Sequence, residues 1–315
     1  MNKKLKIVFA GTPQFAVPTL ERICNKSFEI ICVLTQPDRK AGRGMKTVPS
    51  HVKNTAKKLG LLIMQPQSLK NPEVFNTIKD LKADILVVAA YGLIIPEKIL
   101  NLFHKGCFNV HASLLPRWRG AAPIHRAIEN GDNQIGVTIM KVVSKLDAGP
   151  VIRKISLNLL PQSTTGEMTD LMALKGAALM EEVLEDIIKG NEIKFTIQDE
   201  TKVTYAKKII KTEVKLNIDD SSDKLVRKIK AFNPYPGVTY MFREKILKIW
   251  DATSIHLSSV KKFTPGNLVV LDKKLILILK NSAIELIEVQ IEGGRKINAD
   301  DFIKRNNLDN KVIKI

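Results

Sequence analysis

The sequence predicts an α/β protein in which a doubly wound, Rossmann-like domain precedes a smaller, OB-like β-barrel domain. Near-continuous apolar runs of strand length, such as 5–10 and 83–90, alternate with helical patterns over the first part of the chain. Such runs are typical of parallel strands that are covered on both faces. After residue 208 the pattern changes to short strands at hairpin spacing, which favours a small barrel. We therefore expect domains at 1–190 and 208–315, joined by a linker at 191–207.

Apolar periodicity and capping signals predict the order of the elements. No Gly-x-Gly-x-x-Gly follows the first strand, which argues against a nicotinamide dehydrogenase. A long helix should begin at the capping box formed by Thr164 and Glu167 and end at Gly190. Its buried side should carry Leu171, Leu174, Ala178 and Val183. The other expected elements are strands at 28–35, 61–64, 107–110, 134–142, 245–250, 267–270, 275–279 and 284–289, and helices at 51–59, 72–81, 121–130 and 222–232.

The composition is that of an ordinary soluble protein. Of the 315 residues 44% are hydrophobic and 26% are charged, and no apolar run reaches the length of a membrane span. The first apolar run, 7–10, is too short for a signal-peptide core. Three cysteines without paired spacing and five histidines without ligand spacing predict neither a disulfide framework nor a metal site. We expect a cytoplasmic monomer that does not bind membranes.

The chain carries a large excess of positive charge. The net charge is +18, and residues 208–315 contain 21 Lys and Arg against 13 Asp and Glu. Spread positive charge suits a polyanionic partner such as nucleic acid. A lysine-rich proteome produces the same bias in proteins without any nucleic-acid role. The charge alone therefore leaves both interpretations open.

The candidate chemistry centres on Asn109 and His111, at the end of the strand predicted at 107–110. Residues two apart on a strand project from the same face. An amide can hold a carbonyl oxygen and an imidazole can exchange protons near neutral pH, a combination that suits acyl transfer. A lone Asn-x-His is more often a hydrogen-bonded structural pair. The pair by itself therefore does not decide between catalysis and structure.

The residues that follow this pair favour catalysis. Asn-x-His is followed by Ser-Leu-Leu-Pro-x-x-x-Gly at 113–120, and the combination resembles the signature of the 10-formyltetrahydrofolate-dependent formyltransferases. The longer string SLLPRWRGAAPI, at 113–124, resembles the members of that family whose acceptor is methionyl-tRNA. Segments at 198–206 and 231–237 resemble the family too, so the resemblance covers both domains. It implies transfer of the formyl group of 10-formyltetrahydrofolate to the α-amino group of initiator methionyl-tRNA.

The resemblance also implies roles for individual residues. Asn109 and His111 would stabilise the oxyanion, and Asp147 would orient His111, although an Asp before Ala-Gly is most often a turn residue. Phe15 lies where the family contacts the methionyl side chain, although an apolar residue at a helix start usually belongs to the core. The folate site would be lined by Ser113, Leu114, Leu115, Pro116, Tyr91, Gly92, Leu93 and Ile94.

The segment QPDRKAGRGMKTVP, at 36–49, is rich in Gly, Pro and cations and should form an exposed, mobile loop. It follows the second strand at the carboxyl edge of the sheet, where α/β proteins bind ligands. In the family a similar loop reaches the tRNA acceptor stem, which implies tRNA contacts from Arg39 and Arg43. Lys40 replaces the family's Pro, which adds charge and loosens the backbone.

Two other functions remain as alternatives. Formyltransferases that act on a small amine, such as an amino-sugar nucleotide, use the same Asn-x-His and Asp set. The basic loop at 38–44 and the basic second domain argue against them. A non-enzymatic RNA-binding protein on a former catalytic scaffold is the other alternative. The presence of Asn109, His111 and Asp147 together argues against it.

Overall fold

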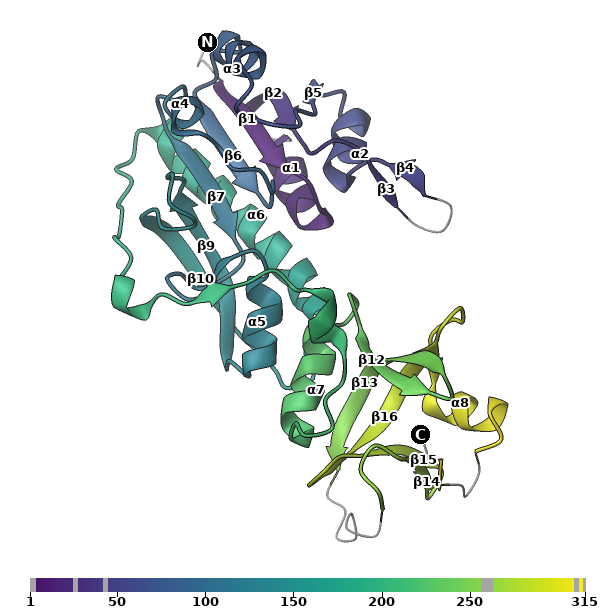
Figure 1. Cartoon of the computed structure of the whole chain (residues 1–315). Helices are drawn as coiled ribbons and strands as arrows, with labels where there is room; N and C mark the ends of the chain where they lie inside the picture. The colour runs from purple at the N-terminus through teal and green to yellow at the C-terminus, as the bar shows by residue number, and fades with distance from the viewer. Residues whose placement is uncertain (1–3, 25–27, 42–44, 256–262, 309–311, 314–315) are drawn as a thin grey trace. The chain divides into compact units, whose positions relative to one another are not determined.

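The structure is a computed structural model that describes residues 4–24, 28–41, 45–255, 263–308 and 312–313 (Figure 1). The chain divides into two compact units. The first contains residues 1–123, 134–157 and 169–206, and the second contains residues 124–133, 158–168 and 207–315. This division differs from the domains expected from sequence in three places. Residues 158–168, expected in the first domain, group with the second unit. The helix expected at 121–130 groups largely with the second unit, and all but the last residue of the expected linker groups with the first.

The first unit is built on a seven-stranded sheet in the order β10-β9-β7-β6-β1-β2-β5 (Figure 1). The five strands from β7 to β5 are parallel, and β9 runs antiparallel to β7. The predicted mostly parallel sheet is therefore confirmed. The strands are β1 (Leu5–Gly11), β2 (Phe28–Leu34), β5 (Ile63–Met64), β6 (Ile85–Ala89), β7 (Cys107–His111), β9 (Gln134–Lys141) and β10 (Val151–Asn158).

The strand order reverses at β1, which lies between β2 and β6. The carboxyl ends of β1, β6 and β7 consequently meet at one edge of the sheet, where open α/β sheets bind their ligands. The helical elements of this unit are η1 (Gln14–Ala16), α1 (Val17–Cys24), α2 (His51–Lys58), α3 (Pro72–Asp80), α4 (Glu97–Leu100), most of α6 (Thr165–Lys189) and η2 (Glu200–Lys202).

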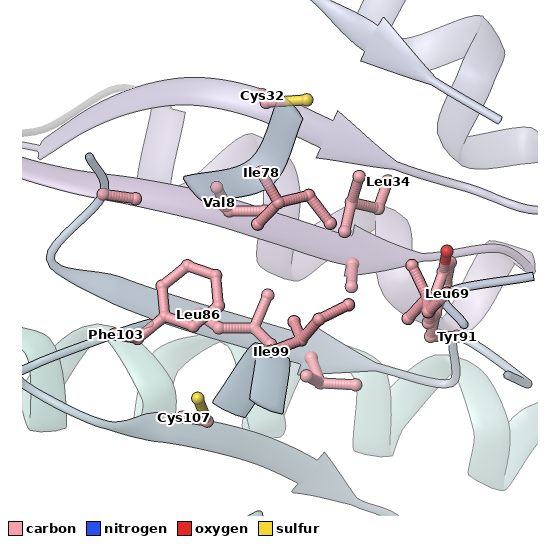
Figure 2. Packing of buried hydrophobic residues seen from close by; sticks show 13 residues of the cluster. Val8, Cys32, Leu34, Leu69, Ile78, Leu86, Tyr91, Ile99, Phe103 and Cys107 are labelled. Atoms are coloured by element: carbon pink, nitrogen blue, oxygen red, sulfur yellow. The ribbon is translucent and has the colours of Figure 1, made fainter. Parts of the chain in front are cut away.

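One face of this sheet packs against α3 and α4. Figure 2 shows Val8 of β1 and Leu86 of β6 in one cluster with Ile78 of α3 and Ile99 of α4. These side chains are almost completely excluded from solvent. Each contributes about 1.5–3 kcal/mol through burial of its apolar surface. The same cluster includes Tyr91, which comes just after β6.

The long helix α6 packs closely on β7 and β9. A Cβ added at Gly176 would lie 2.6 Å from Cγ1 of Val110, so the helix approaches the strands through small residues. Its buried side includes Met172 and Ala177, whereas Leu171 and Leu174 are 39% and 60% exposed. The predicted buried side was therefore wrong for the two leucines, because close packing selected small side chains there. Val183 is fully buried as predicted, and Ala178 is half-buried. The capping box is confirmed: the Thr164 amide donates to Glu167 Oε2 at 2.8 Å, and the Glu167 amide donates to Thr164 Oγ1.

The second unit holds an antiparallel sheet in the order β12-β13-β16-β15-β14-β18, with β17 paired to β16 (Figure 1). An antiparallel sheet was expected here, and its closure into an OB-like barrel stays a prediction. Among the described residues of the whole chain, no helix has the length and apolar character needed to cross a membrane. The elements are α5 (Pro123–Asn130), α7 (Ser222–Ala231), β12 (Val238–Phe242), β13 (Lys245–Ile255), β14 (Leu268–Leu271), β15 (Lys274–Ile278), β16 (Ala283–Ile291), β17 (Ile297–Asn298), α8 (Ala299–Arg305), β18 (Val312–Ile313) and η3 (Lys211–Val214).

Candidate active site

Asn109 and His111 lie at the carboxyl end of β7, two residues apart and so on the same face of the sheet. In the strand register Asn109 is opposite Met140 and His111 is opposite Thr138, both on β9. His111 is 5% exposed, whereas Asn109 is half-buried. Within the described part of the chain the Asn109 amide makes no side-chain hydrogen bond. Its NH2 group is therefore available to an external acceptor.

The His111 ring stands between two acceptors. Nε2 lies 3.0 Å from the main-chain oxygen of Trp118, so this nitrogen must donate. Nδ1 lies 3.7 Å from Oδ2 of Asp147, which is an ion-pair distance and longer than a hydrogen bond. The structure thus places the Asp147 carboxylate beside His111, where it faces the second ring nitrogen.

Asp147 occupies a tight turn between β9 and β10. Its φ of 45° is in the left-handed region, which costs a non-glycine residue on the order of 1 kcal/mol. Its Oδ2 accepts a hydrogen bond from the Gly120 amide at 2.9 Å. The carboxylate is therefore held by the strand β8 (Arg119–Gly120) as well as facing the imidazole. Asp147 therefore both forms the turn and faces His111.

The loop of Ser113, Leu114, Leu115 and Pro116 is held by a buried threonine. The Thr138 hydroxyl donates to the Ser113 carbonyl at 2.7 Å and accepts from the Leu115 amide at 3.2 Å. Ser113 Oγ donates to the Arg117 carbonyl at 2.6 Å. Thr138 is fully buried and pairs with His111 across the strands. The loop predicted to contact folate is therefore coupled to the strand that carries the candidate catalytic pair.

Sequence reasoning missed a group of polar residues that hold the Asp147 turn. Gln198 is buried and donates to the carbonyls of Asp147 and Gly149, and its Oε1 accepts from Nε of Arg119. Arg119 is completely buried. Gln198 belongs to the segment expected as a linker, whose strand β11 (Tyr205–Ala206) pairs with β8. The sequence signal was the resemblance of the segment at 198–206 to the family, which assigned no role to Gln198.

The predicted slot at 91–94 divides into a buried and an exposed part. Tyr91 is 2% exposed and packs in the core of Figure 2, and this burial raises the pKa of its hydroxyl. Its carbonyl accepts hydrogen bonds from Thr12 Oγ1 and Gln36 Nε2, both at 2.9 Å. Gly92, with a φ of 80°, and Ile94 are exposed, and Leu93 is half-buried. The last three residues are the ones available to a ligand at the carboxyl edge.

The remaining predicted residues have different settings. Phe15, in η1 after β1, is 8% exposed, as expected for a core residue. Arg39 is exposed on β3 (Arg39–Ala41), which pairs with β4 (Lys46–Val48) where a loop was expected. Its guanidinium donates to Gln36 Oε1. Arg43 lies outside the described residues.

A cavity of about 420 Å³ opens at the opposite end of β7 from His111. Its wall includes Cys107, Val142 and Phe195, and its charged residues are of both signs, for example Glu97 and Lys141. Burial raises the pKa of the Cys107 thiol to about 12, so this sulfur is not a nucleophile at neutral pH. The cavity therefore takes no part in the chemistry of Asn109 and His111.

The chain belongs to the formyl transferase family. The family model for the formyl transferase domain matches residues 3–184, and the model for the formyl transferase C-terminal domain matches residues 208–307. This membership defines the protein as a formyl-transferring enzyme. It accounts for an amide and an imidazole side by side at the end of β7, since acyl transfer needs donors for a developing oxyanion.

The relatives extend over the whole chain. A protein of Methylococcus capsulatus named methionyl-tRNA formyltransferase is 42% identical over 307 residues, which is 98% of this chain and 99% of the relative. A Helicobacter canadensis N-formyltransferase, solved with folinic acid and dTDP-3-aminofucose, has a TM-score of 0.66 at 18% identity and covers 93% of this chain and 100% of its own. HypX of Aquifex aeolicus with tetrahydrofolic acid has a TM-score of 0.62 at 15% identity, over 99% of this chain and 49% of its own. At these identities the two solved structures support the fold.

Proposed function

We propose that the enzyme transfers the formyl group of 10-formyltetrahydrofolate to the α-amino group of initiator methionyl-tRNA, giving N-formylmethionyl-tRNA for translation initiation. The observation that carries this proposal is the Asn109 amide, which has no side-chain partner among the described residues and lies next to the buried His111. A donor held ready at the end of a strand suits a formyl oxygen. The acceptor follows from the relatives of full length, which carry the name methionyl-tRNA formyltransferase at 39% to 45% identity.

The three candidate residues divide the work of acyl transfer. The free amine of the acceptor attacks the formyl carbon, so no covalent enzyme intermediate is needed. Asn109 donates to the formyl oxygen as it gains negative charge, the step at which preorganised donors contribute most. His111 adds a second donation once its Nε2–H turns from the Trp118 carbonyl, which it meets at 3.0 Å in the structure, and it moves the proton that the amine loses. Asp147, 3.7 Å from Nδ1, orients the His111 ring and fixes its tautomer, and it helps to return a proton to the departing nitrogen.

The residues at the carboxyl edge fit a folate. Leu93 and Ile94 offer apolar surface to an aromatic ring after β6, and the Ser113–Pro116 loop offers main-chain groups after β7. The loop is stiffened by the buried Thr138 hydroxyl, so its polar groups have fixed directions. When bound, 10-formyltetrahydrofolate supplies the activated formyl group. No metal is required by this chemistry.

The proposed tRNA contacts lie on the exposed basic segments. Arg39 is exposed on β3 at the edge where β1 and β6 end, and the second part of the chain is strongly basic. Phosphates are neutralised by spread Lys and Arg side chains, so binding should weaken steeply with salt. We place Phe15 near the methionyl side chain and Arg43 with Arg39 on the acceptor stem. We expect the enzyme to act in the cytoplasm, because aminoacylated tRNA is found in that compartment. We also expect it to be a monomer.

The test compares acceptors with purified protein and 10-formyltetrahydrofolate. Methionyl-tRNA, free methionine and an amino-sugar nucleotide are incubated in parallel, and products are measured by mass spectrometry. We expect formylmethionyl-tRNA as the only product, with a rate that falls as salt rises. Formylation of the sugar nucleotide instead would support the assignment of the catalytic residues but contradict methionyl-tRNA as the acceptor. Absence of any formyl transfer, together with tRNA binding, would indicate a non-enzymatic RNA-binding protein.

A further inference from the structure

The turn that carries Asp147 is held in a strained shape by contacts outside the turn. Asp147 has a left-handed φ of 45°, and a Cβ added at Gly149 would lie 1.8 Å from the Lys141 carbonyl oxygen. The main chain here is therefore both strained and tightly packed. A side chain that binds the turn must offset this strain if Asp147 is to stay 3.7 Å from His111.

Gln198 is the side chain that binds the turn. Its Nε2 donates to the Asp147 carbonyl at 2.8 Å and to the Gly149 carbonyl at 2.7 Å. Both amide hydrogens are thus used on two carbonyls that bracket Ala148. Gln198 is 6% exposed, so water does not replace these bonds readily. The contact with Asp147 spans 51 positions of the sequence.

Arg119 fixes which end of the Gln198 amide faces the turn. Nε of Arg119 donates to Gln198 Oε1 at 3.0 Å, and an arginine cannot accept, so the oxygen must point to Arg119 and the NH2 to the carbonyls. Nη2 of Arg119 donates to Glu200 at 2.8 Å, and Glu200 in turn accepts from Lys145 at 2.8 Å. Lys145 is the first residue of the same turn, so these contacts reach both of its ends. Arg119, Gln198 and Glu200 form a polar clamp around residues 145–149.

The residue type at 198 is set by this geometry. A glutamate would present an acceptor to two carbonyls, and a methionine would leave both carbonyls without a donor. An asparagine is one methylene shorter and would not span the same three partners. Glutamine is the side chain that offers two donors and one acceptor at this reach.

We propose that Gln198 is a positioning residue, which acts through the main chain of Asp147 to hold the carboxylate against His111. This inference rests on the proposed formyl transfer, in which Asp147 orients His111. Gln198 itself touches no reacting atom. Its loss should lower kcat and leave the KM for folate and for methionyl-tRNA unchanged, because the binding residues lie on other loops.

The first test measures the formylation kinetics of Gln198→Glu and Gln198→Met. We expect kcat to fall about tenfold or more in both, with each KM within about twofold of the wild type. The pH profile of kcat should move toward that of Asp147→Asn, which a purely structural residue would not cause. Gln134→Glu, an exposed change of the same kind at the start of β9, is the matched control and should behave as the wild type.

The second test is a double-mutant cycle with Asp147→Asn. If Gln198 acts through Asp147, adding Gln198→Glu to Asp147→Asn should cost little further activity. Multiplication of the two losses would overturn the inference, since Gln198 would then act elsewhere. An unchanged kcat in both Gln198 variants would overturn it as well. Failure of both variants to fold would make Gln198 a folding residue rather than a positioning one.

A third measurement separates this inference from the proposed function. Amide hydrogen exchange across 145–149 is compared in wild type and Gln198→Glu without any substrate. We expect faster exchange in this turn and unchanged exchange in β1 and β6. Equal exchange in the turn would overturn the positioning role even if methionyl-tRNA is formylated. Faster exchange in a protein that formylates no methionyl-tRNA would support the positioning role of Gln198 and contradict methionyl-tRNA as the acceptor.

Discussion

Two regions at the carboxyl edge of the first sheet differ in how their polar side chains are held. Around His111 and Asp147 the polar groups are buried and bonded to the main chain, through Thr138 and Gln198 among others. The hairpin of β3 and β4 has exposed side chains, and its base is tied by the Lys53–Asp38 pair at 2.6 Å. Hydrogen bonds hold the polar side chains of the first region in place, whereas the second region exposes charged side chains to solvent.

The difference follows from what each region must recognise. Stabilising an oxyanion depends on donors placed to within a few tenths of an ångström, which requires rigid surroundings. Attracting a polyphosphate depends on charge near a flexible surface and tolerates movement. Changes near His111 should therefore alter kcat or stability, whereas changes in the hairpin should alter affinity and its salt dependence.

The largest expected effect is on the rate after Asn109→Ala. The change removes a donor to the formyl oxygen, so kcat should fall roughly 100-fold or more. The melting temperature should change little, because the amide makes no side-chain hydrogen bond within the described residues. Stopped formylation assays and thermal unfolding measure the two quantities. An unchanged kcat would remove Asn109 from the chemistry.

The next effect is on stability after Thr138→Val. Valine has nearly the same shape but leaves the Leu115 amide and the Ser113 carbonyl without their buried partner. The free energy of unfolding should fall by about 1–3 kcal/mol, measured in urea. Thr77→Val on α3, whose exposed hydroxyl bonds to the Glu73 carbonyl, is a control that should cost less. Equal losses in the two variants would contradict a special role for the buried hydroxyl.

A smaller effect, confined to affinity, is expected for Arg39→Ala. Loss of one phosphate contact should raise the KM for methionyl-tRNA several-fold and reduce the slope of log affinity against log salt by about one. Both kcat and the KM for folate should stay unchanged. Lys70→Ala, an exposed charge just before α3, is the control. A fall in kcat instead would show that Arg39 contributes to the chemical step, as the residues around His111 do, and not to tRNA affinity alone.

The smallest effect concerns Glu200, at the exposed end of the clamp. Hydrogen bonds from Arg119 and Lys145 lower the pKa of this carboxyl to about 2. Because the folded pKa is depressed, its stabilisation is fully present above the unfolded value near 4.5 and is lost as pH falls toward 2. The difference in melting temperature between wild type and Glu200→Gln should thus be small at pH 7 and vanish near pH 2. A difference that grows in acid would contradict this assignment.

Local patterns predicted much of the fold. The continuous apolar runs located β1, β2, β6 and β7, because buried parallel strands need apolar side chains on both faces. They failed on α6, where Leu171 and Leu174 are exposed and small residues face the sheet. Periodicity reports which residues are apolar, and close packing on β7 and β9 favoured Gly176 and its small neighbours. Such packing is a property of two elements together.

The candidate site was predicted in part for a similar reason. Asn109, His111 and Asp147 belong to short motifs that a single stretch of sequence reveals. Gln198 lies in a segment that resembles the family, but its role could not be predicted because its partner Arg119 is 79 positions away. The Tyr91 side chain packs in the core, so its expected folate contact concerns the main chain and stays a prediction. Long-range pairing of polar groups leaves little trace in local composition.

The pairing of β8 with β11 determines where a fragment of this protein can be ended. A fragment that stops at Gly190 would include Asn109, His111 and Asp147 and yet lack Gln198, Glu200 and the strand Tyr205–Ala206. Such a fragment would expose the buried guanidinium of Arg119 and release the turn of Asp147. The smallest autonomous catalytic piece must therefore extend to Ala206, so a boundary drawn from the motifs alone would yield an inactive protein.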